Sequence, residues 1–152
     1  DRIGHGTNLF DISLVDLPTA NERERYVHRL SEYIADRRIT IEVCLTSNMQ
    51  TIPSLQKLED HAFKKMLEEK LSTTICTDNR LVSHTTVTEE LVKAVEHFHI
   101  TPNNLRNLII YGFKRSFFFG NYTEKREYVR SVINRYELLE KQFGVVRTKA
   151  VS

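Results

Sequence analysis

The sequence lacks long apolar runs and a strong charge of either sign. No stretch of its 152 residues approaches the roughly 20 consecutive apolar residues of a membrane-spanning helix. Lys and Arg total 22 against 20 Asp and Glu, which leaves a net charge of +2 and no basic surface typical of nucleic-acid binding. The first residues do not follow the basic, apolar, small-residue order of a secretory signal. We therefore expect a soluble, cytoplasmic protein that binds neither nucleic acid nor a membrane.

Glycine, proline and cysteine are also scarce. Five Gly and three Pro exclude collagen-like and linker-like chains. The two cysteines, Cys44 and Cys76, do not form a CxxC motif, which argues against a zinc ribbon or a thioredoxin-like site. We expect both to be buried, unreactive thiols in strands. The chain begins at Asp1 without an initiator methionine, so we expect it to be part of a longer or processed protein.

Several segments place apolar residues every three or four positions, the spacing of amphipathic helices. In the helix that opens at Pro102, the apolar stripe reaches Gly112. The stripe either ends there or allows a neighbouring element to pack closely. The predicted helices cover residues 20–37, 54–70, a segment opening at Thr88, a segment opening at Pro102, and 122–143.

Strand-like segments alternate with these helices. Residues 39–45 alternate β-branched and polar side chains, so that Glu42 and Cys44 share a face, and residues 72–77 form a second β-branched run. Residues 46–54 are polar and contain Pro53, which predicts a loop. Residues 2–4 have the character of the end of a third strand.

The order of elements predicts an α/β fold with parallel strands. Two or three parallel strands cannot close a barrel, and an open parallel sheet this narrow leaves both edges unpaired. We therefore expect the remaining strands to lie on residues outside this chain.

Polar residues follow each predicted strand. They are His5 between two glycines, the run from Cys44 to Asn48, and the run from Thr77 to Arg80. Catalytic groups of α/β barrels gather at the carboxyl ends of strands, and a His and an Asp meeting there would suit metal-assisted hydrolysis.

Structural roles are open for the same residues. A histidine between glycines is often a turn residue, and Asp78-Asn79 after a strand is commonly an Asx-turn or a helix cap. The aromatic run at residues 117–119 is expected to close a core rather than to form a binding patch.

Three motifs follow one another along the chain: Arg2-Ile3-Gly4-His5-Gly6, Ile41-Glu42-Val43-Cys44-Leu45-Thr46-Ser47-Asn48 and Thr77-Asp78-Asn79-Arg80. Together they resemble the C-terminal half of the adenosine deaminase family, and the resemblance extends from His5 to about Tyr122. It implies the C-terminal part of a TIM-type (β/α)8 barrel with two to three parallel strands and a long C-terminal helix. Residues 1–152 would be one portion of a single domain.

The resemblance implies a zinc-dependent hydrolysis of adenosine, or a related 6-aminopurine nucleoside, to inosine and ammonia. It makes Asp78 a zinc ligand, and His5 the catalytic group that hydrogen-bonds the zinc-bound water. Asn79 would contact the purine ring, while Glu42 and Ser47 would hold the other groups in place.

The sequence departs from the family pattern in ways that limit this inference. The other zinc ligands and the glutamate that protonates the ring belong to earlier strands of the family and have no counterpart here. We therefore expect these residues alone to be inactive, with the N-terminal half of the barrel as the structural partner. Asn79, Arg80 and Ala62 stand where many members have Asp, Pro and Pro. The alternatives are a deaminase of adenine or of a modified adenosine and, in another class, a non-catalytic α/β interaction domain.

Overall fold

The computed structural model describes residues 1–147, which form a parallel sheet flanked by helices. The strands β1 (Arg2–Gly4), β2 (Thr40–Val43) and β3 (Thr73–Ile75) lie in the order β1-β2-β3. Ile3 pairs with Ile41 and Ile41 with Thr73, so that the three carboxyl ends meet at one edge. The predicted α/β class and parallel pairing are confirmed, and residues 2–4 do form the third strand.

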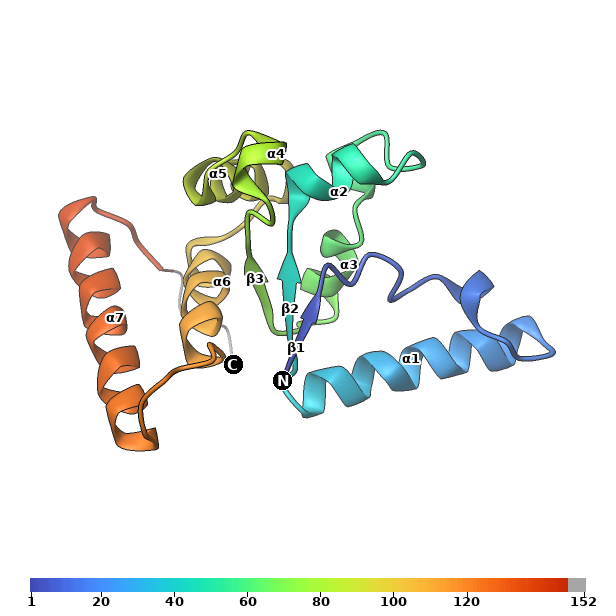
Figure 1. Ribbon diagram of the computed structural model, residues 1–152, viewed down its shortest axis with the longest axis horizontal. Helices are drawn as coiled ribbons and strands as arrows, with labels where there is room; N and C mark the ends of the chain where they lie inside the picture. Colours follow the sequence, from blue (N-terminus) through green and yellow to red (C-terminus); the bar gives the residue numbers. More distant parts are fainter. Residues whose placement is uncertain (148–152) are drawn as a thin grey trace.

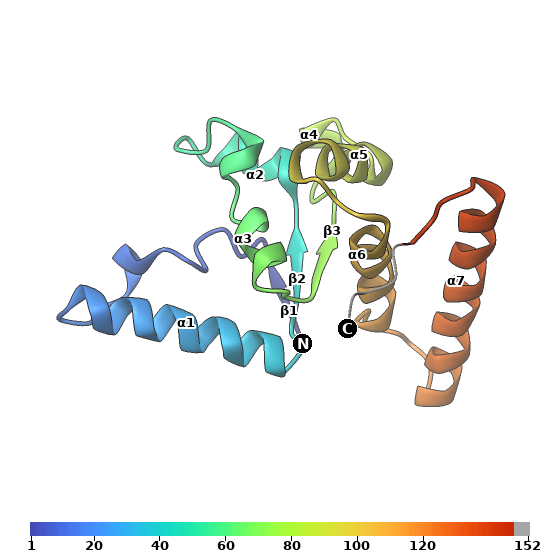
Figure 2. The same ribbon diagram turned by 180° about the vertical axis from the view of Figure 1, so that it is seen from behind.

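Helices surround this sheet (Figure 1). The helices α1 and α7 lie on opposite sides of it, while α2, α4 and α5 lie beyond the carboxyl ends of the strands, as the reverse view in Figure 2 also shows. Among residues 1–147, no helix combines the length and the apolar character needed to cross a membrane. The α-helices are α1 (Ala20–Asp36), α2 (Leu45–Thr51), α3 (Phe63–Glu68), α4 (Arg80–Ser83), α5 (Val87–Phe98), α6 (Pro102–Lys114) and α7 (Tyr122–Gln142).

Side-chain caps define where the long helices begin. Thr19, Thr86 and Asn121 each accept a hydrogen bond from the backbone N–H three residues later, and a glutamate at that position bonds back to the cap. In α6, Pro102 occupies the first turn, where its missing N–H costs nothing. These local signals explain why the predicted positions of α1, α5, α6 and α7 agree closely with the structure.

Two predictions between β2 and β3 were wrong. Residues 46–54 were expected to form a loop, yet residues 45–51 form α2, whose first turn is completed when the buried Glu90 carboxylate accepts the Thr46 N–H at 3.1 Å. The helix expected over residues 54–70 is reduced to a 3-10 turn at Leu58–Asp60 and to α3. A side chain rather than the apolar spacing sets the start of α3, because His61 Nδ1 accepts the Phe63 N–H at 2.9 Å.

The core lies between the sheet and its helices. Its centre includes the fully buried side chains of Ile41, Val43, Leu45, Phe63, Met66 and Ala94. On α6, Gly112 lies against β3 so closely that a Cβ atom there would be 2.6 Å from Thr74 Oγ1. Because α6 continues to Lys114, close packing rather than helix termination explains this glycine.

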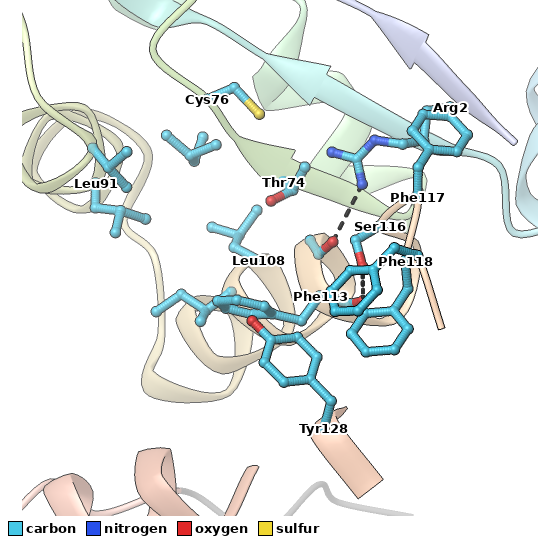
Figure 3. Close-up of a pocket in the computed structure, with 15 residues that line it drawn as sticks. Arg2, Thr74, Cys76, Leu91, Leu108, Phe113, Ser116, Phe117, Phe118 and Tyr128 are labelled. Carbon is cyan, nitrogen blue, oxygen red and sulfur yellow. Dashed lines mark hydrogen bonds between the residues drawn. The ribbon is translucent and has the colours of Figure 1, made fainter. Parts of the chain in front are cut away.

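The aromatic run after α6 does not close a core among the described residues. Phe117 and Phe119 are 86% and 99% exposed, and Phe118 stacks between Phe119 and Tyr128, with ring centroids 4.8 and 5.3 Å away. The expected core role is therefore wrong for two of the three rings. The run also borders a largely apolar cavity of about 820 Å³, in which Phe113, Phe118 and Tyr128 lie together on one side (Figure 3).

Candidate active site

Three polar side chains meet at the carboxyl edge of the sheet. His5 directly follows β1, Ser47 lies in the first turn of α2 after β2, and Asp78 follows β3. Ser47 Oγ donates a hydrogen bond to Asp78 Oδ2 at 2.7 Å, and His5 Nε2 lies 4.0 Å from the same oxygen. The parallel topology thus brings together residues that are up to 73 positions apart in the sequence.

The backbone at His5 and Asp78 is unusual. Both have positive φ angles, 60° and 53°, a conformation that non-glycine residues adopt rarely and at a cost of about 1–3 kcal/mol. The other non-glycine residues with positive φ in the described chain are Arg38, Lys70, His84 and His99, and these follow helix ends, where the conformation is common. The positive φ angles of His5 and Asp78 occur instead at the ends of β1 and β3, and residues held in this region cluster at functional sites.

Neighbouring atoms hold His5 in this conformation. Its backbone N–H donates to the carbonyl of Glu42 at 2.8 Å, which extends the pairing of β1 with β2. The next residue, Gly6, has φ +63°, and a Cβ atom there would lie 2.9 Å from Ile41 Cγ2. A larger residue at this position would displace the histidine from the sheet edge.

The space between His5 and Asp78 suits a bound atom. A separation of 4.0 Å is too long for a direct hydrogen bond but leaves room for an atom that contacts both groups. The two side chains are about equally accessible, 42% and 44% exposed, so the space is open to solvent. An imidazole and a carboxylate facing a shared, accessible position can together bind a cation or activate a water molecule.

The side chains of Glu42 and Asn79 have other contacts. The Glu42 carboxylate pairs with Arg2 Nε, so the contact of Glu42 with His5 is through its carbonyl group. Asn79 Oδ1 accepts the backbone N–H groups of Leu81 and Val82 at 3.1 and 3.2 Å and caps α4, the structural role that was left open. This cap uses only the oxygen of the amide.

The cysteines are free thiols, Cys44 buried and Cys76 half-buried. Burial raises the pKa of Cys44 to about 12 and also raises that of Cys76. Neither thiol is therefore a thiolate near neutral pH, as expected for unreactive cysteines. Their expected place was wrong, because each cysteine lies just after a strand, Cys44 after β2 and Cys76 after β3.

Two further polar residues lie behind His5: Asn48, from the polar run predicted after the strand, and His61, which was not anticipated from the sequence. Asn48 and His61 are only 3% and 2% exposed. Asn48 Nδ2 is 3.0 Å from His5 Nδ1, and Asn48 Oδ1 is 3.0 Å from His61 Nε2. Burial, followed by repulsion from His5, lowers the pKa of His61 to about 4, so this ring is neutral near pH 7. Asn48 belongs to the polar run predicted after the strand, whereas His61 lies 13 positions further along, and no local pattern indicated that these two residues would meet.

A metal site is incomplete within the described residues. Over residues 1–147, no three His, Cys, Asp or Glu side chains are grouped so as to hold a metal ion. Zinc sites use three or four protein ligands, and here the carboxylate of Asp78 and the ring of His5 are the donors at the sheet edge. These donor types fit part of a zinc site, and a zinc ion held there would need further ligands from outside residues 1–147.

The chain is similar in sequence to curated adenosine deaminases. The one from Mycobacteroides abscessus is 33% identical over 117 residues, covering 77% of this chain and 31% of that protein. The one from Mycolicibacterium gilvum is 31% identical over 140 residues, covering 91% of this chain and 37% of that protein. The chain therefore spans about a third of the length of these relatives.

Solved structures with a similar fold are also deaminases. Adenine deaminase from Arthrobacter aurescens gives a TM-score of 0.65 at 18% identity, over 90% of this chain and 36% of that one. The N6-methyl-AMP deaminase of Arabidopsis thaliana gives 0.59 at 19% identity, over 88% and 40%. At these identities the likeness shows the fold alone: the parallel sheet is part of a TIM-type (β/α)8 barrel.

The chain also matches the model of a protein family. The model of the family described as adenosine deaminase matches residues 1–135, which include all three strands and every residue of the site described above. The chain belongs to the adenosine deaminase family.

Proposed function

We propose that these residues form the C-terminal portion of a zinc-dependent aminohydrolase that converts adenosine, or a related 6-aminopurine nucleoside, to inosine or its analogue and ammonia. The observation that carries this proposal is the approach of His5 Nε2 to within 4.0 Å of Asp78 Oδ2, on strained backbone at two strand ends. Family membership supports the reaction class.

Each side chain at the sheet edge has a role in this proposal. Asp78 is a zinc ligand, and the hydrogen bond from Ser47 fixes its Oδ2 so that the carboxylate keeps one orientation. His5 orients the attacking water through Nε2. Asn79, whose amide NH2 is not used by the α4 cap, donates one hydrogen bond to a purine ring nitrogen. Zinc, when bound, supplies a water molecule whose pKa is lowered towards about 7.

We further propose that residues 1–152 are part of a single barrel domain whose N-terminal strands and remaining zinc ligands lie outside this chain. A three-stranded parallel sheet leaves pairing groups free on the outer sides of β1 and β3. The apolar cavity beside β3 and the exposed rings of Phe117 and Phe119 offer the surface that those residues would cover.

The test is an assay of the complete gene product with adenosine, adenine and N6-methyl-AMP, which also ranks the alternative substrates. Asp78→Ala should lose both zinc and activity, because a ligand anchors the ion. His5→Ala should keep zinc and lose turnover by on the order of 10²-fold or more. The exposed residues Asp16 and His28 provide matched controls, and Asp16→Ala and His28→Ala should leave both properties unchanged.

Two results would contradict the proposal. A zinc-free His5→Ala protein beside a zinc-loaded Asp78→Ala protein would show that the roles are wrong. A wild-type protein that deaminates none of the three compounds would favour a non-catalytic interaction domain.

A further inference from the structure

We propose that Asn48 is a positioning residue for catalysis: together with His61, it fixes the ring orientation and the tautomer of His5, so that His5 presents Nε2–H to the reacting water. This inference rests on the proposed function for its catalytic meaning. Its structural content, the position of one proton on His5, stands on the hydrogen bonds alone.

The chain of hydrogen bonds starts at a group that can only donate. The backbone N–H of Phe63 points at His61 Nδ1, 2.9 Å away, so that this nitrogen must accept and carries no proton. A neutral imidazole then carries its proton on Nε2. His61 Nε2–H therefore donates to the atom it faces at 3.0 Å, Asn48 Oδ1.

This bond determines the amide orientation of Asn48 and, through it, the tautomer of His5. With its oxygen facing His61, Asn48 directs its Nδ2 hydrogens at His5 Nδ1, 3.0 Å away. His5 Nδ1 must accept, so the proton of the neutral ring lies on Nε2. Nε2 is the nitrogen that faces Asp78 Oδ2 across the 4.0 Å gap.

Burial makes this arrangement the preferred one. Asn48 and His61 are almost completely buried, so water cannot replace a lost partner, and an unpaired donor or acceptor there is costly. This series of hydrogen bonds also connects separate elements, since His5 follows β1, Asn48 lies in α2 and His61 precedes α3. Reversing the amide would place two donors against each other at the His61 end, where Nε2–H would face the Nδ2 hydrogens of Asn48.

Asn48→Asp is the sharpest perturbation, because it preserves the shape of the side chain while it replaces the amide donor with an acceptor and adds a negative charge. The carboxylate can still accept from His61, but it can only accept from His5, so the proton of His5 should move to Nδ1. We expect kcat to fall by on the order of 10²-fold or more with a much smaller change in KM. Thr40→Val is the matched control. It removes the 2.8 Å hydrogen bond between the hydroxyl groups of Thr40, a buried residue of β2, and Ser72, and it should lower stability without this loss of kcat.

The second measurement does not depend on activity. Nitrogen NMR of the complete protein labelled with ¹⁵N-histidine reports which ring nitrogen of His5 is protonated, with His5→Gln used to assign the signals. Protonation at Nε2 in the wild type and at Nδ1 in Asn48→Asp is the expected result. A wild-type His5 protonated at Nδ1 would overturn the inference, even if Asn48→Asp does not fold.

The kinetic and spectroscopic results separate this inference from the proposed function. A wild-type protein without deaminase activity would refute the function, while the NMR result would still decide the tautomer. An active wild type whose Asn48→Asp variant keeps normal kcat would refute the positioning role of Asn48 and leave the function standing.

Discussion

Protonation of His61 should destabilise the folded protein as the pH falls. The ring is buried, it accepts the Phe63 N–H through Nδ1, and His5 is the titratable group whose charge adds to the lowering of its pKa. Adding a proton to Nδ1 would place two N–H donors against each other at a buried position. The folded state therefore disfavours charged His61, whereas the unfolded chain accepts the proton readily.

The size of the effect follows from the shift of the His61 pKa from 6.5 to about 4. Because the folded-state pKa lies below the unfolded value, the unfolded chain takes up the proton first as the pH falls. The stabilisation is fully present above the unfolded pKa and is lost progressively below it. Since one pKa unit corresponds to about 1.4 kcal/mol, the loss between about pH 7.5 and about pH 5 is about 2 kcal/mol.

Urea unfolding of the complete protein at several pH values measures this loss, in the presence of a chelator so that bound metal does not contribute. His61→Gln removes the titrating group and should flatten the pH dependence by about 2 kcal/mol over this range. His28→Gln changes an exposed histidine of α1 and should leave the dependence as in the wild type. Equal slopes for wild type and His61→Gln would refute the reasoning, because His61 would then not be held neutral by the fold.

Two further substitutions test the close contacts around the site. Asn79→Ser keeps an oxygen that can cap α4 but removes the amide donor, so kcat/KM for a purine should fall by the equivalent of about 1–3 kcal/mol with little change in melting temperature; an unchanged kcat/KM would leave Asn79 with the cap alone. Gly112→Ala should destabilise the protein by about 1–3 kcal/mol in urea unfolding, because the new Cβ would meet Thr74 Oγ1, and Thr74→Ala should recover part of the loss. A Gly112→Ala protein as stable as the wild type would show that α6 moves freely against β3.

The features that the sequence predicted well depend on local signals. Three of the four strand residues 40–43 are β-branched, and the helices that begin after Thr19, Thr86 and Asn121 carry their own capping residues. The parallel topology then requires the residues after each strand to meet at one edge of the sheet. For this reason the proximity of His5, Ser47 and Asp78 could be predicted without a structure.

The features that could not be predicted from the sequence depend on contacts between residues that are distant along the chain. The first turn of α2 is completed by Glu90, 44 positions after Thr46, and no local pattern in residues 46–54 indicates that partner. His61 is separated from Asn48 by 13 positions and from His5 by more, so its part in the site depends on how α2 and α3 pack. Phe117 and Phe119 were predicted to be buried, because an apolar run favours burial. The sequence pattern does not indicate whether the surface that covers such a run lies among the same residues.

The described residues divide the proposed site into a complete part and an incomplete one. The groups that orient His5 and Asp78 are all present: the Glu42 carbonyl and Asn48 for the histidine, and Ser47 for the carboxylate. The donors that would complete a zinc site are not. Contacts within this part of the chain therefore support the positions of both residues. In the proposed enzyme, Asn48 and Ser47 would orient the histidine and the carboxylate towards ligands supplied from outside the described residues, because groups that hydrogen-bond a metal-site residue fix its orientation.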